Sequence, residues 1–150
     1  MNWQTSLIFA FLVCVALATP AMSAAESTAS IEAKLIYGTN AEDQPTEEQL
    51  KDIEPRLKPD FGYRNYRLLG EKIFKLKEGN EEKCELGHQI EVSIKHNGTK
   101  KQFQVLGVNL YHQNKWLFFI EVSVQQKSKP IFIKGPFTKD GLVIIMLTAK

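Results

Sequence analysis

The feature that most constrains the fold is a two-residue alternation of apolar and polar side chains, repeated from about Tyr63 to the C-terminus. In QIEVSIKH, isoleucine and valine take turns with glutamate, serine and lysine. Neighbouring side chains of a β-strand point to opposite faces, so this pattern is typical of a strand with one face buried. Because only short turn segments separate the runs, they predict antiparallel strands joined by hairpins.

These runs predict a mainly β (α+β) fold: an antiparallel β-sandwich or open barrel of about seven to eight strands, with one short helix after the first strand. The expected strands lie within residues 31–37, 63–69, 72–77, 89–96, 100–112, 116–126, 130–135 and 142–149. Thr46 and Gln49 have the spacing of a capping box at the helix start. Pro55 limits or kinks this helix, and residues 59–62 end it. The last two strands are apolar at successive positions, which predicts cover on both faces.

Two glycines predict local features of the sheet. Asn97-Gly98 favours a hairpin with a type I′ turn, because that turn requires positive φ at both central residues. The apolar positions change phase around Gly107, with Val105 before it and Val108 after it. Such a slip predicts a β-bulge at Gly107.

The N-terminal segment predicts export. An uninterrupted apolar run from Leu7 to Leu17 is followed by Pro20 and small residues, and it is shorter than the roughly 20 apolar residues that span a bilayer. We expect a cleaved signal peptide over residues 1–23, with a cut as late as residue 25, and a retained interfacial anchor is the alternative. A flexible lead-in over residues 24–30 and a single domain over residues 31–150 then remain, without a transmembrane span. This domain is expected to be periplasmic or extracellular.

Cys84 is the only cysteine left once the signal, with Cys14, is removed. A single cysteine in an exported protein is a buried apolar residue, an intermolecular bridge or a reactive thiol. Alternation places Cys84 with Leu86, so we favour the buried residue. Cys84 and His88 alone are too few ligands for a metal site.

The stretch FGYRNYRLL, residues 61–69, matches an aromatic-Gly-aromatic pattern of RNA-binding sheets. Such a sheet needs two crossover helices, whereas this chain predicts one helix and an export signal, so no nucleic-acid partner is expected. Alternation places Tyr63 and Arg67 on one face and Tyr66 on the other, in the core. Tyr63 and Arg67 are the candidate ligand-binding pair, and a purely structural role is the alternative.

Charge is distributed unevenly, although the net charge is only +2. Acidic residues prevail up to Asp60, and the rest of the chain is basic, with Lys95, Lys100 and Lys101 around one turn. These three lysines are candidate contacts for an anionic glycan or lipid surface. The alternative is a solvated face, because the lysines alternate with apolar residues as outward strand positions do.

Catalytic signatures are missing from the sequence. Neither a nucleophile elbow nor a cysteine-protease signature occurs, and the adjacent carboxylate pairs do not face each other in a helix or strand. His88, His96 and His112 are scattered over strand ends, where exposure to solvent is expected. We therefore expect no catalytic residue, no metal and no cofactor.

The segments IEAKLIYGTN, LKPDFGYRNYRLL, CELGHQIEV and GPFTKDGLVIIML, placed after a signal, resemble a loose family of small exported bacterial proteins of unassigned function. The resemblance covers nearly the whole mature chain and implies a location in the bacterial cell envelope. It carries over no catalytic or binding residue.

These observations favour an exported, non-catalytic binding or assembly module of the bacterial cell envelope that acts through a protein partner. The alternative is binding of an anionic glycan or lipid headgroup by the basic second half. A hydrolase has the least support.

Overall fold

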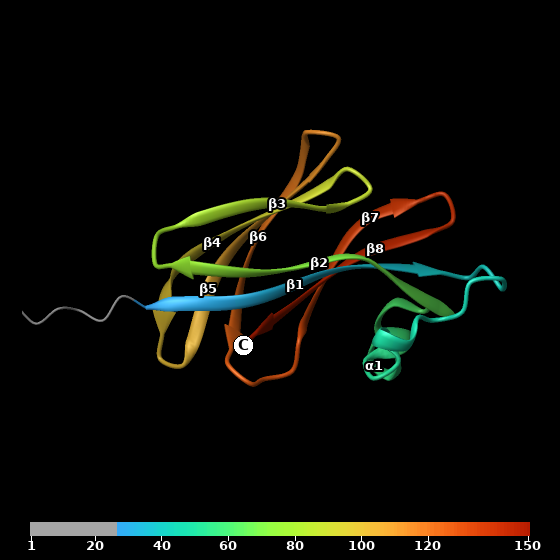
Figure 1. The fold of residues 1–150 in the computed structure, drawn as a ribbon, viewed down its shortest axis with the longest axis horizontal. Coiled ribbons are helices and arrows are strands. Elements are labelled where there is room, and N and C mark those ends of the chain that lie inside the picture. Colours follow the sequence, from blue (N-terminus) through green and yellow to red (C-terminus); the bar gives the residue numbers. More distant parts are fainter. Residues whose placement is uncertain (1–26) are drawn as a thin grey trace, which may run out of the picture.

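The computed structural model describes residues 27–150, which form a sandwich of two antiparallel four-stranded sheets (Figure 1). The strand order is β2-β1-β8-β7 in the first sheet and β3-β4-β5-β6 in the second. The elements are β1 (Thr28–Thr39), η1 (a 3-10 helix, Glu48–Leu50), α1 (Glu54–Phe61), β2 (Asn65–Lys77), β3 (Glu81–Gly87), β4 (Ile90–Lys100), β5 (Phe103–His112), β6 (Lys115–Gln125), β7 (Ile131–Thr138) and β8 (Gly141–Ala149). The predicted mainly β fold is confirmed, in its sandwich form.

The main core lies between the two sheets and follows from the alternation. Ile31 and Leu35 of β1 and Ile94 and Leu106 of the second sheet are fully buried there. Burying an apolar side chain of this size stabilises the fold by about 1.5–3 kcal/mol. The alternate apolar positions therefore decide which face of each strand turns inward.

A second apolar cluster covers the outer face of the first sheet. Leu50 of η1 and Leu57 of α1 pack there with Ile144 and Met146 of β8. The intervening Ile145 belongs to the main core, so β8 is covered on both faces, as predicted. Figure 1 shows α1 near the end of β1, where the chain leaves the sheet and returns as β2.

The start of the helix differs from the prediction, and its end agrees only at Gly62, because Pro59 lies inside the helix. The Thr46 hydroxyl donates to Glu54 Oε1 at 2.9 Å and accepts from the Tyr66 backbone N–H at 3.1 Å, so it does not form a capping box. The α-helix begins at Glu54, with Pro55 in the first turn, where a missing N–H costs little. It ends at Gly62, whose left-handed φ of 75° and N–H bond to the Lys58 carbonyl close the last turn.

The hairpin prediction at Asn97-Gly98 is wrong. Both residues lie within β4, and the turn to β5 comes later, because Lys100 pairs with Phe103. Gly98 uses its positive φ of 117° in a β-bulge, since the register between β4 and β5 shifts between His96 and Gly98. The bulge predicted at Gly107 is therefore wrong too: the extra residue lies in the partner strand.

Strand β1 begins at Thr28, so residues 28–30 of the predicted lead-in are part of the first sheet. The backbone N–H of Lys150 donates to the Ser30 carbonyl at 2.9 Å, which ties the last residue to β1. The predicted signal peptide, residues 1–23 or 1–25, lies outside the described residues. Within residues 27–150, no helix is long and apolar enough to cross a membrane.

Candidate functional site

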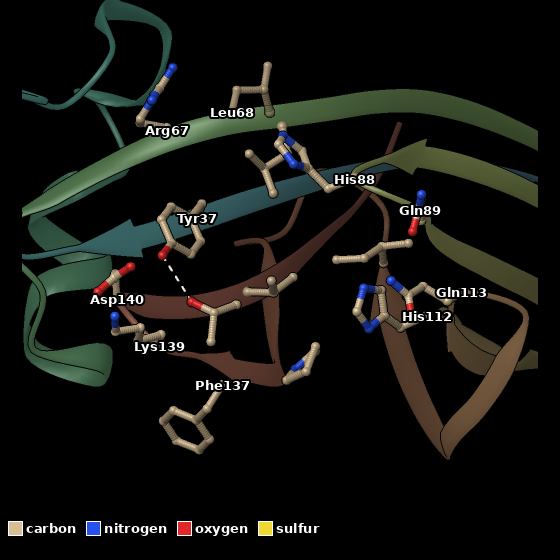
Figure 2. Close-up of a pocket in the computed structure, with 15 residues that line it drawn as sticks. Tyr37, Arg67, Leu68, His88, Gln89, His112, Gln113, Phe137, Lys139 and Asp140 are labelled. Carbon is tan, nitrogen blue, oxygen red and sulfur yellow. Dashed lines mark hydrogen bonds between the residues drawn. The ribbon is translucent and has the colours of Figure 1, made fainter.

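A pocket of about 790 Å³ lies at one open end of the sandwich, and we call it the end pocket (Figure 2). Its wall from the first sheet includes Tyr37, Leu69 and Val143, and its wall from the second includes Ile90. The hairpin between β7 and β8, residues 136–140, closes one side. The volume lies within the range of small-molecule sites, roughly 300–1,000 Å³.

Two tight turns carry the polar rim of the end pocket. His88 and Gln89, between β3 and β4, both have left-handed φ values, of 52° and 58°, and so does Gln113, at 51°, between β5 and β6. The Gln113 N–H donates to the Gln89 carbonyl at 2.9 Å, so the two turns hold each other. His112 precedes the second turn and lines the same cavity. A rim fixed in this way needs little reorganisation to receive a ligand.

Sequence reasoning missed this grouping of histidines. His88 and His112 are far apart in the chain, yet both come to the end pocket because antiparallel hairpins return to the same end of the sheet. His96 differs from the expected exposure: it is fully buried, and neither ring nitrogen has a hydrogen-bond partner among the described residues. No group of three or more His, Cys, Asp or Glu side chains in residues 27–150 is placed to hold a metal.

The stretch FGYRNYRLL does not form one recognition surface. Tyr66 is fully buried in the second apolar cluster, as predicted, and burial raises the pKa of its hydroxyl. Tyr63 precedes β2, so strand alternation does not apply to it, and its ring packs against the same cluster. The predicted separation of the two tyrosines onto opposite faces is therefore wrong.

Tyr63 and Arg67 border different depressions. Tyr63 lines a shallow one with Thr39 and Asn40, whereas Arg67 lines the end pocket. Figure 2 shows the Arg67 side chain pointing away from the cavity. Its Nε lies 3.6 Å from an oxygen of Glu47, and its Nη1 donates to Gln44 at 3.0 Å. The structure thus does not bring the two predicted ligand-binding residues into one site.

The three lysines lie away from the end pocket. Lys100 and Lys101 are exposed where β4 turns into β5, at the opposite end of β4 from Ile90. Lys95 lies before the bulge and pairs in register with Glu81 of β3. An anionic surface held by these lysines would contact the other end of the sandwich.

A cluster of exposed apolar side chains lies on β6. We call residues 116–120 the β6 edge, because β6 is the last strand of the second sheet and pairs only with β5. Trp116 and Phe119 are 59% and 54% exposed, and Leu117 and Ile120 are also exposed. Trp116 Nε1 donates to Asn109 Oδ1 at 3.2 Å, and the Phe119 ring lies over Gly107 of β5. These contacts hold both rings against the sheet.

Cys84 is half-buried rather than fully buried. It packs at the border of the main core and its Sγ lies 3.3 Å from the Glu85 carbonyl, to which it donates. The ammonium of Lys72 lies nearby and pairs with Glu82, and this hydrogen bond raises the pKa of Lys72. The thiol is free.

Comparisons with protein-family models, with curated proteins and with solved structures found no match for this chain.

Proposed function

We propose that this protein is an exported, non-catalytic binding module of the bacterial cell envelope, and that it acts by adding an extended segment of a protein partner to β6. The observation that carries the proposal is the unprotected β6 edge. From Trp116 to Ile120 it presents five successive apolar residues, with no lysine, no proline and no acidic residue among them. An exposed strand of this kind is a template for pairing with another chain.

The other three sheet edges support this choice by contrast. Strand β2 carries several lysines, β3 has the sequence EEKCELG, and β7 contains Lys134 and Pro136. Charged residues and proline on an edge discourage pairing with other strands. Strand β7 also exposes an aromatic ring, Phe137, but near Lys134 and Pro136. Among the four edges described, only β6 has five successive apolar residues, and its charged residues Lys115 and Glu121 lie on either side of them.

The side chains of the β6 edge would add binding energy to backbone pairing. Aromatic residues are enriched among the residues that dominate protein interfaces, because a large rigid ring buries much area at a small entropic cost. Trp116 and Phe119 are held against the sheet before any partner arrives. Exported status and envelope location rest on the predicted signal and on the sequence resemblance.

A second candidate is a glycan, and the ring geometry favours it over the lysine surface. Trp116 and Phe119 are both more than half exposed, and a sugar ring could stack on them. Asn109 and Glu121 lie beside them and offer hydrogen bonds. This candidate uses the side chains of β6 and not its free backbone.

Site-specific photo-crosslinking in the native envelope tests the proposal. A photoreactive residue at position 119 should give a specific protein adduct, and one at position 73 should not. Ile73, on β2, is a matched control because it is 52% exposed and apolar but lies on a charged edge. Mapping the adduct should identify an extended partner segment.

A second part of the experiment introduces a charge on the surface. Phe119→Lys should abolish capture of that partner, and Ile73→Lys should leave it intact, since only the first places a charge on the β6 edge. Equal capture by both variants would contradict the proposal. Adducts that disappear when soluble polysaccharide is added would support the glycan instead.

A further inference from the structure

We propose that the end pocket binds an amphipathic carboxylate, with an apolar chain held between the two sheets and the carboxylate held at the rim by donors of the two turns at which His88 and His112 lie. This site is separate from the β6 edge, so the inference does not depend on the proposed function.

The inner wall of the pocket is an extension of the main core. Ile90 and Val143 are 3% and 2% exposed, and Leu69 packs against the same core cluster. The Tyr37 ring forms a further wall, and its hydroxyl is bonded to the Thr138 hydroxyl at 2.9 Å, which fixes the ring (Figure 2). A hydrocarbon chain that enters here leaves water for apolar contacts, which is favourable in proportion to the area buried.

The rim supplies hydrogen-bond donors with no other role in the described chain. The side chains of His88, Gln89, His112 and Gln113 make no hydrogen bond within residues 27–150. A neutral imidazole donates one hydrogen bond and a protonated one donates two, and the protonated form also carries positive charge. The two histidines therefore suit an anionic acceptor better than a cation.

The position of the charges around the rim selects the side on which the head group lies. Asp140 is the only acidic residue of the lining, and Figure 2 shows it beside Lys139, on the side away from His88 and His112. Glu85, outside the lining, contacts the first turn, where its Oε1 accepts from the Gln89 N–H at 3.2 Å. Arg67 is already paired with Glu47. A carboxylate beside the imidazoles thus avoids Asp140, whereas a head group with several negative charges finds too few cations. These features point to a single carboxylate.

Calorimetric titration of the mature chain with decanoate, decanol and decyltrimethylammonium, each below its micellar concentration, tests the assignment. Decanoate should bind, decanol should bind about tenfold more weakly because it loses the charged hydrogen bonds, and the ammonium should not bind measurably. Shorter carboxylates should bind progressively more weakly, because each methylene removed takes away buried apolar area. Equal affinity for all three probes, or no binding of decanoate, would overturn the proposal.

Two variants locate the site. The double variant His88→Ala with His112→Ala should weaken decanoate binding about tenfold and leave the melting temperature nearly unchanged, because neither side chain is buried in the core. Phe119→Lys should bind decanoate as the unaltered protein does. Loss of decanoate binding in Phe119→Lys, with the histidine variant unaffected, would place the ligand on the β6 edge and refute the end-pocket assignment.

Discussion

The ring of Phe119 in β6 occupies the space that a side chain at Gly107 in β5 would need. A Cβ atom at position 107 would come within 3.0 Å of Phe119 Cε2 and 3.4 Å of its Cζ. Gly107 is not a bulge residue, because it pairs in register with Lys95 and with Glu121. Its missing side chain lets the aromatic ring lie against the sheet. This contact holds one of the two exposed rings of the β6 edge against β5.

In a double-mutant cycle, the effects of changes at Gly107 and Phe119 on the free energy of unfolding should be strongly coupled. Gly107→Ala alone should be neutral or mildly destabilising, because the Phe119 ring must move. In a Phe119→Ala background the same change should be less unfavourable by about 0.5–1 kcal/mol, because only the Asn97 side chain, whose Nδ2 would lie 3.2 Å from the new Cβ, then has to shift. Denaturant midpoints of the four proteins measure this. An identical effect of Gly107→Ala in both backgrounds would show that the ring does not depend on the glycine.

Replacement of His96 by leucine should stabilise the protein. The imidazole is fully buried without a hydrogen-bond partner among the described residues, and such a group costs about 1–3 kcal/mol of desolvation. The backbone bonds of His96 to Gly79 and Asn80 do not involve the side chain and should persist. The check is the free energy of unfolding, with the exposed His88→Leu as control. A loss of stability in His96→Leu would mean that the imidazole has a partner in solution.

Replacement of Lys101 by glycine should stabilise the protein. This residue has a left-handed φ of 58° at the turn between β4 and β5, a conformation that costs a non-glycine residue roughly 1–2 kcal/mol. Lys101→Gly should therefore raise the melting temperature. Gln102→Gly, at the neighbouring position, should not raise it, because residue 102 does not have a positive φ. A gain from Gln102→Gly with none from Lys101→Gly would place the turn differently.

Tyr66 should make stability depend on alkaline pH. Burial raises the pKa of its hydroxyl above the ordinary value of 10.0, and the backbone of Tyr63 opposes this only in part. The folded state then holds the proton more tightly than the unfolded state, so this contribution to stability is present below pH 10 and declines above it. Unfolding free energies of the unaltered protein and of Tyr66→Phe, measured from pH 8 to 11, should diverge above about pH 10. Parallel curves would show that Tyr66 ionises in the folded protein as it does in the unfolded chain.

Local patterns determined much of this protein. Alternation predicted most of the strands and their inward faces, but the expected strands 63–69 and 72–77 form the single strand β2, and β3 was not expected. The doubly apolar terminal strand predicted that β8 is buried on both sides. Gly62, at the end of the residues predicted to break the helix, closes it. These features depend on residues close together in the chain, whose side-chain directions follow from the backbone period alone.

Tertiary structure decided the rest. Alternation does not determine which strands pair or in what register, so Asn97-Gly98, a strong local turn signal, became a bulge inside a longer strand pair. The same long-range pairing brought His88 and His112 to one pocket and left β6 at a sheet edge. It also placed Tyr63 and Tyr66 in one cluster, because the strand starts only at Asn65. Register is set by the packing of two sheets against each other, which no short stretch of sequence contains.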